Sequence, residues 1–294
     1  MRPLRSLLAS LLIAACAGLG CAGAADARGP KDAVDADPDA LAAPASASPR
    51  TAVPLHVLLV AVGDEQPVFD RFVADLAQRF GALDVASLAT ASSSGTVGRR
   101  LDAPADVYAA IRGLREQRQG RGEPGESQGG CLVYLTGHGT RAGLSMPLGA
   151  ASVPAASERR RYAVLKPRDL DAALRQGCGE APTIVVASAC YSGVYLGRAA
   201  GLRDAGRIVL TAAARDRTSF GCGDDETHTY YDGCFLRSLD ELRPVAAAPW
   251  RELAARTQAC VAGRERALLP GSPPSNPQSF FADGLDGLPL PRPR

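Results

Sequence analysis

Apolar residues along this chain fall into short continuous runs separated by segments of helical spacing. Near-continuous runs cover residues 55–62, 131–136, 183–187 and 207–211. Such runs are typical of strands buried on both faces of a parallel sheet. A further, weaker strand is predicted over residues 83–88.

Between these runs, apolar residues return every three or four positions, as on one face of a helix. Helices are predicted over residues 68–80, 104–118, 169–174, 235–242 and 250–268. Strands alternating with helices predict an α/β fold with an open, mostly parallel sheet flanked by helices. Because ligands bind at the carboxyl ends of strands in such sheets, residues that follow the strands are the first candidates for a functional site.

The first 21 residues carry the pattern of an export signal. Two arginines precede an apolar run over residues 6–15, which is shorter than the about 20 apolar residues that cross a bilayer. Residues 13–16 resemble a bacterial lipobox, which predicts lipidation of Cys16 after cleavage; Cys21 is a second choice, and simple cleavage near Ala24 is the alternative. We expect an exported protein, held at the periplasmic face of a bacterial membrane as a lipoprotein, or periplasmic or secreted.

Composition divides the rest of the chain into three parts. Residues 22–54 are rich in Ala, Asp, Pro and Ser and predict a disordered tether. Residues 55–288 form one predicted domain, in which the glycine-rich segment 120–130 is expected to be a mobile loop. Residues 289–294 are expected to be a polar, proline-rich tail.

Charge and motif content exclude several classes of function. The net charge of +2 gives no strong field for nucleic acid. No CxxC pair, HExxH motif or phosphate-binding loop is present, so neither a metal site nor a cofactor is predicted. Three arginines at residues 159–161 predict a solvated charged surface, with recognition of acidic substrate side chains as the alternative.

Two of the predicted strands end in short polar segments of small residues. The third strand leads into Gly137-His138-Gly139, and the fourth leads into a segment that contains Cys190. If the strands are neighbours, both side chains project from one edge of the sheet, where an imidazole can take the proton of a thiol nucleophile. The flanking glycines let a substrate backbone approach closely, and the Gly139 and Cys190 N–H groups form a candidate oxyanion hole.

Each residue alone also has an ordinary structural interpretation. A single cysteine after a buried strand is more often a small core residue than a nucleophile, and a lone histidine is more often structural. The other two histidines indicate no chemistry: His56 is expected to pack at the end of a strand, and His228 to lie in a solvated acidic loop.

Both motifs together resemble peptidase family C13, the legumain-like branch of the caspase-type cysteine peptidases, and in particular its bacterial members. The residues that carry the resemblance are Thr136-Gly137-His138-Gly139 and Val186-Ala187-Ser188-Ala189-Cys190-Tyr191-Ser192-Gly193, with further similarity over most of residues 55–283. The resemblance implies a caspase-like fold, with His138 and Cys190 as catalytic residues and Gly139 contributing to the oxyanion hole. It also implies that Ser219 lines the pocket for the residue before the scissile bond.

The predicted specificity pocket departs from that of the legumains. Ser188 stands where they carry a glutamate, and Asp232 lies one position before the place of their aspartate. Their asparagine after the first strand has only Asp64 as a nearby counterpart. Ser188, Ser219 and Asp232 are therefore the candidate pocket residues, and no preference for asparagine is predicted.

The chain contains eight cysteines, and their number limits which disulfides the predicted domain can form. With Cys16 and Cys21 in the signal region and Cys190 free, five remain. A disulfide between Cys131 and Cys178 is one hypothesis, because both precede adjacent strands. A second hypothesis pairs Cys222 with Cys234 or Cys260.

Taken together, the sequence predicts an exported cysteine endopeptidase that cleaves peptide bonds through a Cys190 thioester, with His138 as general acid and base. Its expected partners are a peptide or protein substrate and, through the lipid anchor, a membrane; nucleic acid is not expected. The alternatives are a transamidase or ligase of the same fold, and a caspase-like binding module without turnover.

Overall fold

A computed structural model of the chain describes residues 52–63, 66–119, 129–149, 161–204, 206–223 and 225–294. All of them belong to one compact unit, residues 47–294. The predicted signal, the lipidation site Cys16, most of the tether, Asp64, most of the glycine-rich loop and two of the three arginines at 159–161 lie outside the described residues; Arg161 is exposed.

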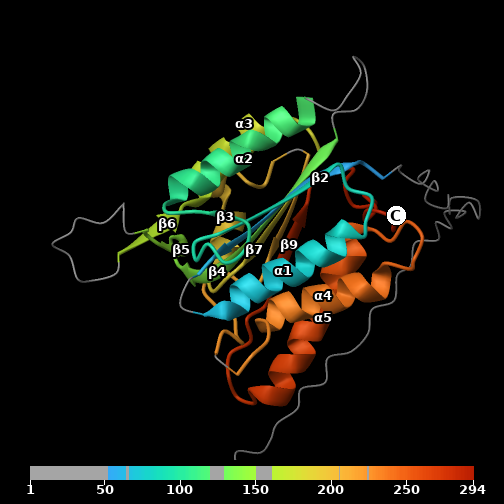
Figure 1. Ribbon diagram of the computed structural model, residues 1–294. Coiled ribbons are helices and arrows are strands. Elements are labelled where there is room, and N and C mark those ends of the chain that lie inside the picture. The colour runs from blue at the N-terminus through green and yellow to red at the C-terminus, as the bar shows by residue number, and fades with distance from the viewer. Residues whose placement is uncertain (1–51, 64–65, 120–128, 150–160, 205, 224) are drawn as a thin grey trace, which may run out of the picture. The chain divides into compact units, whose positions relative to one another are not determined.

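The described residues form a nine-stranded, mostly parallel sheet with the order β3-β2-β1-β4-β7-β8-β9 (Figure 1). These strands are β1 (Leu55–Val62), β2 (Ser87–Ser92), β3 (Arg99–Arg100), β4 (Gly130–Thr140), β7 (Thr183–Ser188), β8 (Arg207–Thr211) and β9 (Gln278–Phe281). Only β9 pairs antiparallel along this row. Two further strands, β5 (Gly143–Pro147) and β6 (Tyr162–Leu165), continue antiparallel from the end of β4.

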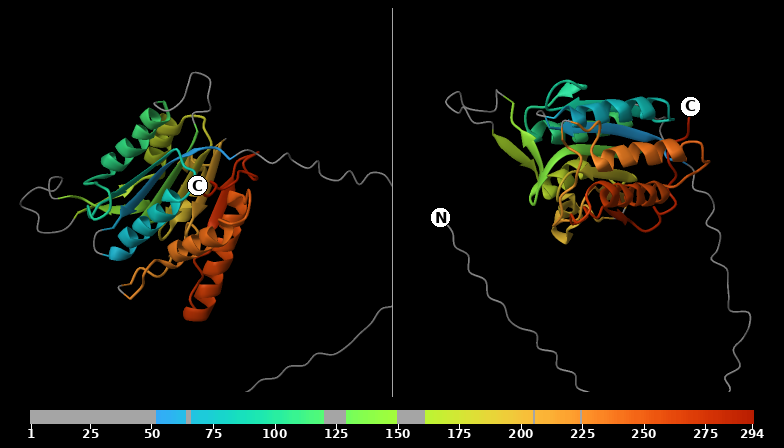
Figure 2. Two further views of the ribbon diagram at one scale, coloured as in Figure 1. Left: turned by 45° about the vertical axis from the view of Figure 1, so that its right-hand side comes forward. Right: turned by 90° about the horizontal axis from the view of Figure 1, so that it is seen from below.

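Helices cover both faces of the sheet, as predicted, and Figure 2 shows the two layers. One face carries α1 (Pro67–Gly81), α4 (Tyr230–Leu242) and α5 (Trp250–Leu268), and the other carries α2 (Pro104–Gln119) and α3 (Pro167–Cys178). Two 3-10 turns, η2 (Ser192–Leu196) and η3 (Arg198–Ala200), follow β7. The alternating side chains of the buried strands divide the core into two apolar clusters, one per face.

Four predicted elements differ from those observed. The helix predicted over 169–174 extends from Pro167 to Cys178. The second strand covers Ser87–Ser92 and not residues 83–88, because its register with β1 begins at the pair His56 and Ser87. The strand before His138 does not stop at the glycines but runs through them to Thr140 and pairs with β5. The helix predicted over 235–242 begins at Tyr230, where the Thr229 hydroxyl caps its first turn.

Residues 289–294 are not a free tail. Leu290 is buried, and its N–H donates to the Ala248 carbonyl. The Asp84 N–H donates to the carbonyl of Arg292, and the Arg294 N–H donates to that of Ala82. The end of the chain therefore closes the apolar layer between α1 and α4.

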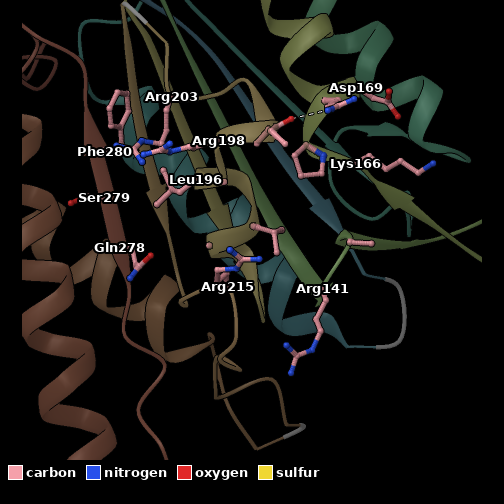
Figure 3. Close-up of a pocket in the computed structure, with 18 residues that line it drawn as sticks. Arg141, Lys166, Asp169, Leu196, Arg198, Arg203, Arg215, Gln278, Ser279 and Phe280 are labelled. Atoms are coloured by element: carbon pink, nitrogen blue, oxygen red, sulfur yellow. Dashed lines mark hydrogen bonds between the residues drawn. The ribbon is translucent and has the colours of Figure 1, made fainter.

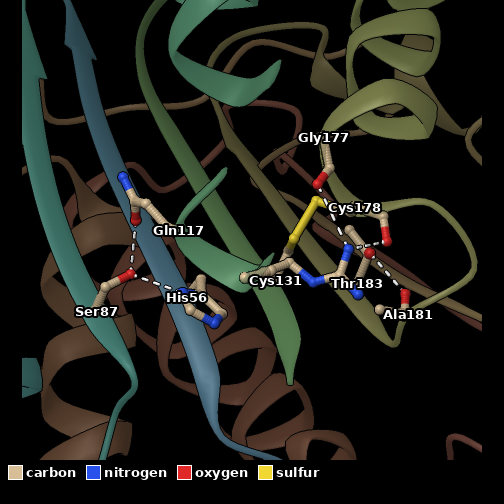
Figure 4. Close-up of a disulfide and its surroundings, with 9 residues drawn as sticks. His56, Ser87, Gln117, Cys131, Gly177, Cys178, Ala181 and Thr183 are labelled. Atoms are coloured by element: carbon tan, nitrogen blue, oxygen red, sulfur yellow. Dashed lines mark hydrogen bonds between the residues drawn. A yellow bond between two sulfur atoms is a disulfide. The ribbon is translucent and has the colours of Figure 1, made fainter. Parts of the chain in front are cut away.

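Two disulfides cross-link the body. The predicted pair Cys131–Cys178 is present and joins the start of β4 to the end of α3 (Figure 4). The second hypothesis was wrong, because Cys234 pairs with Cys260 and joins α4 to α5, while Cys222 is a free thiol. Helix α4 thus places Cys234 beside α5.

His56 is buried at the start of β1, as expected, with its Nδ1 2.9 Å from the Ser87 hydroxyl (Figure 4). Among the described residues, no helix is long and apolar enough to cross a membrane. The same part of the chain contains no cluster of three or more His, Cys, Asp or Glu side chains that could hold a metal ion.

Candidate active site

The sheet register brings the two polar strand ends together. In the parallel pair of β4 and β7, Thr136 lies opposite Ser188, the last residues in register. His138 and Cys190 each follow two residues later, so the adjacent strands deliver them to the same edge. This confirms the expectation that the third and fourth strands are neighbours.

Strand alternation indicates the face toward which the His138 side chain points, because His138 lies within β4 whereas Cys190 follows the end of β7. Residues two apart in a strand share a face, and Thr136 and Ser188 both hydrogen-bond to Asp232 at the start of α4. The His138 ring lies on this same side, edge-on to the Phe69 ring of α1 with 5.2 Å between ring centroids.

Gly139 lies directly against the turn that carries Cys190. A Cβ at this position would be 2.9 Å from both the Ala189 Cβ and the Cys190 carbonyl carbon, and closer still to the Cys190 carbonyl oxygen. Only glycine lets β4 pass this close to the turn.

Two N–H groups at this contact are available to a bound oxyanion. Leu144 lies opposite Gly139 in the antiparallel pair of β4 and β5, but its N–H donates to the Tyr195 hydroxyl at 3.0 Å. Since the Leu144 N–H does not donate to Gly139, the two residues form a non-hydrogen-bonded antiparallel pair. In a pair of this kind the Gly139 N–H points away from β5. The Cys190 N–H donates to no other described residue.

The Cys190 thiol contacts Ser219, in the segment between β8 and α4. The Ser219 N–H donates to Sγ at 3.3 Å, and Sγ lies 3.5 Å from the Ser219 carbonyl oxygen and 3.6 Å from its hydroxyl. Within the described part of the chain, His138 donates no hydrogen bond to this sulfur. The thiol is half-buried and contacts Ser219, the serine for which the family resemblance implies a place in the substrate pocket.

The residue after the cysteine has an unusual backbone. Tyr191 has a φ of 58°, in the left-handed region that bulky side chains rarely adopt. Its N–H donates to the Arg217 carbonyl at 2.7 Å, and the Arg141 guanidinium lies over its ring, 5.1 Å from the centroid. Such strain costs about 1–3 kcal/mol and is concentrated at functional sites.

A buried carboxylate links the two strands beneath the site. Asp232 is fully buried and accepts hydrogen bonds from the Tyr134 hydroxyl at 2.8 Å and the Thr136 hydroxyl at 2.7 Å. Burial raises the pKa of Asp232, while the hydrogen bonds from Ser188, Thr136, Tyr134 and Thr229 oppose that rise. Burial and the nearby Asp232 raise the pKa of Tyr134 well above its usual value.

The candidate pocket residues thus occupy two different positions. Ser219 lies at the thiol, whereas Ser188 and Asp232 are buried below it and are exposed by 2% and 0%. Within the described residues, Ser188 and Asp232 connect β4 and β7 to α4 and do not line an open cleft. Asp64 lies outside the described residues.

Four residues lie beside the site although sequence reasoning did not place them there: Phe69, Tyr134, Thr136 and Cys222. Tyr134 and Thr136 precede His138 at intervals of two, so strand alternation could have placed them on the same face. Burial and the proximity of Cys190 raise the pKa of the Cys222 thiol.

The expected solvated position of His228 was wrong. Its side chain is only 16% exposed, and Nε2 lies 2.8 Å from Asp75 Oδ2. The ring also packs edge-on against Phe72, so His228 ties the loop before α4 to α1.

Comparison with known proteins agrees with this geometry. The family model for the Peptidase C13 family matches residues 104–242, which include both strand ends. No curated protein matches the chain. Among solved structures, caspase-1 from Spodoptera frugiperda is similar, with 13% sequence identity and a TM-score of 0.51 over 77% of this chain and 85% of that one. The family match over residues 104–242 and the caspase-like fold together support a C13, caspase-like family for this chain.

Proposed function

We propose that this protein is a cysteine endopeptidase in which Cys190 is the nucleophile and His138 is the general acid and base. The observation that carries the proposal is the contact between Gly139 and the Cys190 turn, which joins the two motifs at one edge of the sheet. A thiol and an imidazole held at one edge, next to two available N–H groups, have the parts that acyl transfer needs.

In the first half of the reaction, His138 takes the thiol proton and Sγ attacks the substrate carbonyl carbon. The resulting oxyanion accepts hydrogen bonds from the Gly139 and Cys190 N–H groups. Collapse breaks the C–N bond, and the proton passes from His138 to the departing amine, leaving a thioester on Cys190.

In the second half, a water molecule loses a proton to His138 and attacks the thioester carbonyl. The C–S bond breaks, the carboxylic acid product leaves, and the proton returns to sulfur. An amine in place of water would give transamidation at the same site, which is the second candidate because members of this family include ligases.

The direct test is cleavage of a peptide library by the full chain, with products identified by mass spectrometry. The proposal expects new amino and carboxyl termini in equal amounts, and none with Cys190→Ala or His138→Ala. Added hydroxylamine or a free peptide amine distinguishes the two reactions, because transamidation adds the mass of the amine to the acyl product. Cleavage by Cys190→Ala at the rate of wild type would overturn the proposal.

We also propose that the protein is exported and lipidated at Cys16. The two disulfides of the body support an oxidising compartment, and the sequence before residue 22 has the form of an export signal. Mass analysis of the amino-terminal peptide of membrane-bound protein tests this: a diacylglyceryl mass on Cys16 is expected, and it disappears with Cys16→Ser. An unmodified peptide that begins after Cys16 would contradict it.

A further inference from the structure

A large cleft lies beside the Cys190 turn, on the face of the sheet that carries α3. Its volume is about 1190 Å³, above the about 300–1,000 Å³ of a typical small-molecule pocket. Its walls come from the β4–β5 turn, the start of α3, the two 3-10 turns and β9 (Figure 3). This face is opposite to the one on which Asp232 lies, so the cleft is separate from the predicted specificity pocket.

Positive charge dominates this cleft. Six cations line it against the single acid Asp169. The six are Arg141, Lys166, Arg168, Arg198, Arg203 and Arg215. The resulting local charge of +5 exceeds the net charge of +2 of the whole chain.

The charges of these six side chains are not neutralised within the described part of the chain. Each of the six is exposed, and none forms an ion pair with a described acid. Arg168 donates only to the Ala199 carbonyl, and Arg203 lies over the Phe280 ring, 5.1 Å from its centroid. Like charges around one cleft repel one another, so the arrangement is suited to a ligand with several negative charges.

The cleft adjoins the turn that carries Cys190. Arg141 stacks on Tyr191, which directly follows Cys190. Gly193, the third residue after Cys190, lines the cleft and packs against the backbone of Arg215. The cleft therefore lies next to the turn on which the thiol is held.

The character of the wall favours an acidic polypeptide over a nucleic acid. Val194 and Leu196 provide apolar surface between the cations, which suits the stems of aspartate and glutamate side chains. Single-stranded nucleic acid is bound by aromatic rings open to stacking, whereas the Phe280 ring of this cleft is already covered by Arg203.

We propose that this basic cleft binds an acidic stretch of the polypeptide substrate, away from the residue at the scissile bond. The inference rests on the proposed peptidase function and names its substrate class: proteins with several Asp or Glu residues near the cleaved bond. Acidic side chains would form charge-assisted hydrogen bonds to Arg198 and Arg203, which both line the cleft (Figure 3).

Binding is tested on the full chain with Cys190→Ala, so that no probe is consumed. The probe is a fluorescent peptide in which glutamate alternates with alanine, and its control has glutamine in place of glutamate. By fluorescence anisotropy, the glutamate peptide is expected to bind at least about tenfold more tightly, and added salt is expected to reduce the difference.

Two double variants identify the site. Arg198→Ala/Arg203→Ala is expected to abolish the preference for glutamate. The matched control Arg112→Ala/Arg115→Ala removes two exposed arginines of α2 outside the cleft and is expected to leave the preference unchanged. No preference in the wild-type cleft, or a preference that survives in Arg198→Ala/Arg203→Ala, would overturn the inference.

Competition and turnover complete the test. Succinate that displaces the glutamate peptide at the peptide's own concentration would identify a small-anion site and overturn the substrate assignment. With Cys190 restored, the kcat/KM for glutamate peptides should exceed that for glutamine peptides, and the excess should vanish in Arg198→Ala/Arg203→Ala. If wild type cleaves no peptide, the peptidase proposal fails, while the binding result still decides the role of the cleft.

Discussion

Replacing Gly139 by alanine changes the contact on which the proposed site depends. The new Cβ would be 2.9 Å from the Ala189 Cβ and the Cys190 carbonyl carbon, whereas carbon atoms in contact prefer about 3.5–4.0 Å. The Cys190 carbonyl oxygen is closer still, so the β4 end and the Cys190 turn must separate by at least about 1 Å. A displacement of this size between catalytic groups costs about 100-fold in rate, and the overpacking costs about 1–3 kcal/mol of stability.

The assay is kcat/KM for a cleaved peptide, with the free energy of unfolding from urea titration in parallel. We expect Gly139→Ala to stay folded and to lose about 100-fold in kcat/KM, since alanine keeps the N–H group and changes only the spacing. The matched control is Gly113→Ala in α2, where a Cβ meets nothing within 4 Å. It should gain up to about 1 kcal/mol of stability with unchanged activity. Wild-type kcat/KM in Gly139→Ala would refute this reasoning.

Three further predictions concern the buried groups. Asp232→Ala removes the carboxylate that accepts hydrogen bonds from the Tyr134 and Thr136 hydroxyls and should cost about 3–5 kcal/mol in urea unfolding; a loss below about 1 kcal/mol would contradict the network. Burial raises the pKa of Asp232 in the folded protein. Its contribution to the free energy of unfolding is therefore fully present below the unfolded-state pKa of about 3.9, and it is lost as the pH rises through the folded-state pKa. The stability of wild type relative to Asp232→Asn should therefore fall as pH rises from about 4, and a constant or rising difference would show that the aspartate stays ionised. Replacing Cys131 and Cys178 together by serine opens a 47-residue separation and should lower stability by about 4 kcal/mol, with unchanged stability as the contrary result.

The sequence predicts the central strands well because each is a continuous apolar run that only a doubly covered parallel sheet can bury. The run at residues 55–62 matches β1 residue for residue, and the strand before Cys190 ends one residue later than predicted. The glycines around His138 led to the wrong prediction that the strand ends there. They are needed for close contacts between elements and not for a turn: Gly137 makes room for the Val62 side chain, and Gly139 makes room for the Cys190 turn.

The packing of residues 289–294 and the pairing of Cys234 with Cys260 depend on contacts that local patterns do not contain. Residues 289–294 look polar and proline-rich, yet Leu290 is buried in the apolar cluster that also contains residues of α1 and α4. The basic cleft could not be predicted from the sequence either, because its cations come from segments far apart along the chain. Their convergence requires the fold.

The central claim is that His138 activates Cys190, and the protein supplies its own reference thiol. Cys190 and Cys222 are the free cysteines among the described residues, and burial raises the pKa of Cys222, which slows its alkylation. The measurement is the rate of iodoacetamide labelling at each cysteine at pH 7.5, by peptide mass spectrometry, in wild type and His138→Ala. We predict that Cys190 reacts faster than Cys222 in wild type and that His138→Ala removes most of this excess. Equal rates in wild type, or an excess unchanged in His138→Ala, would contradict the account.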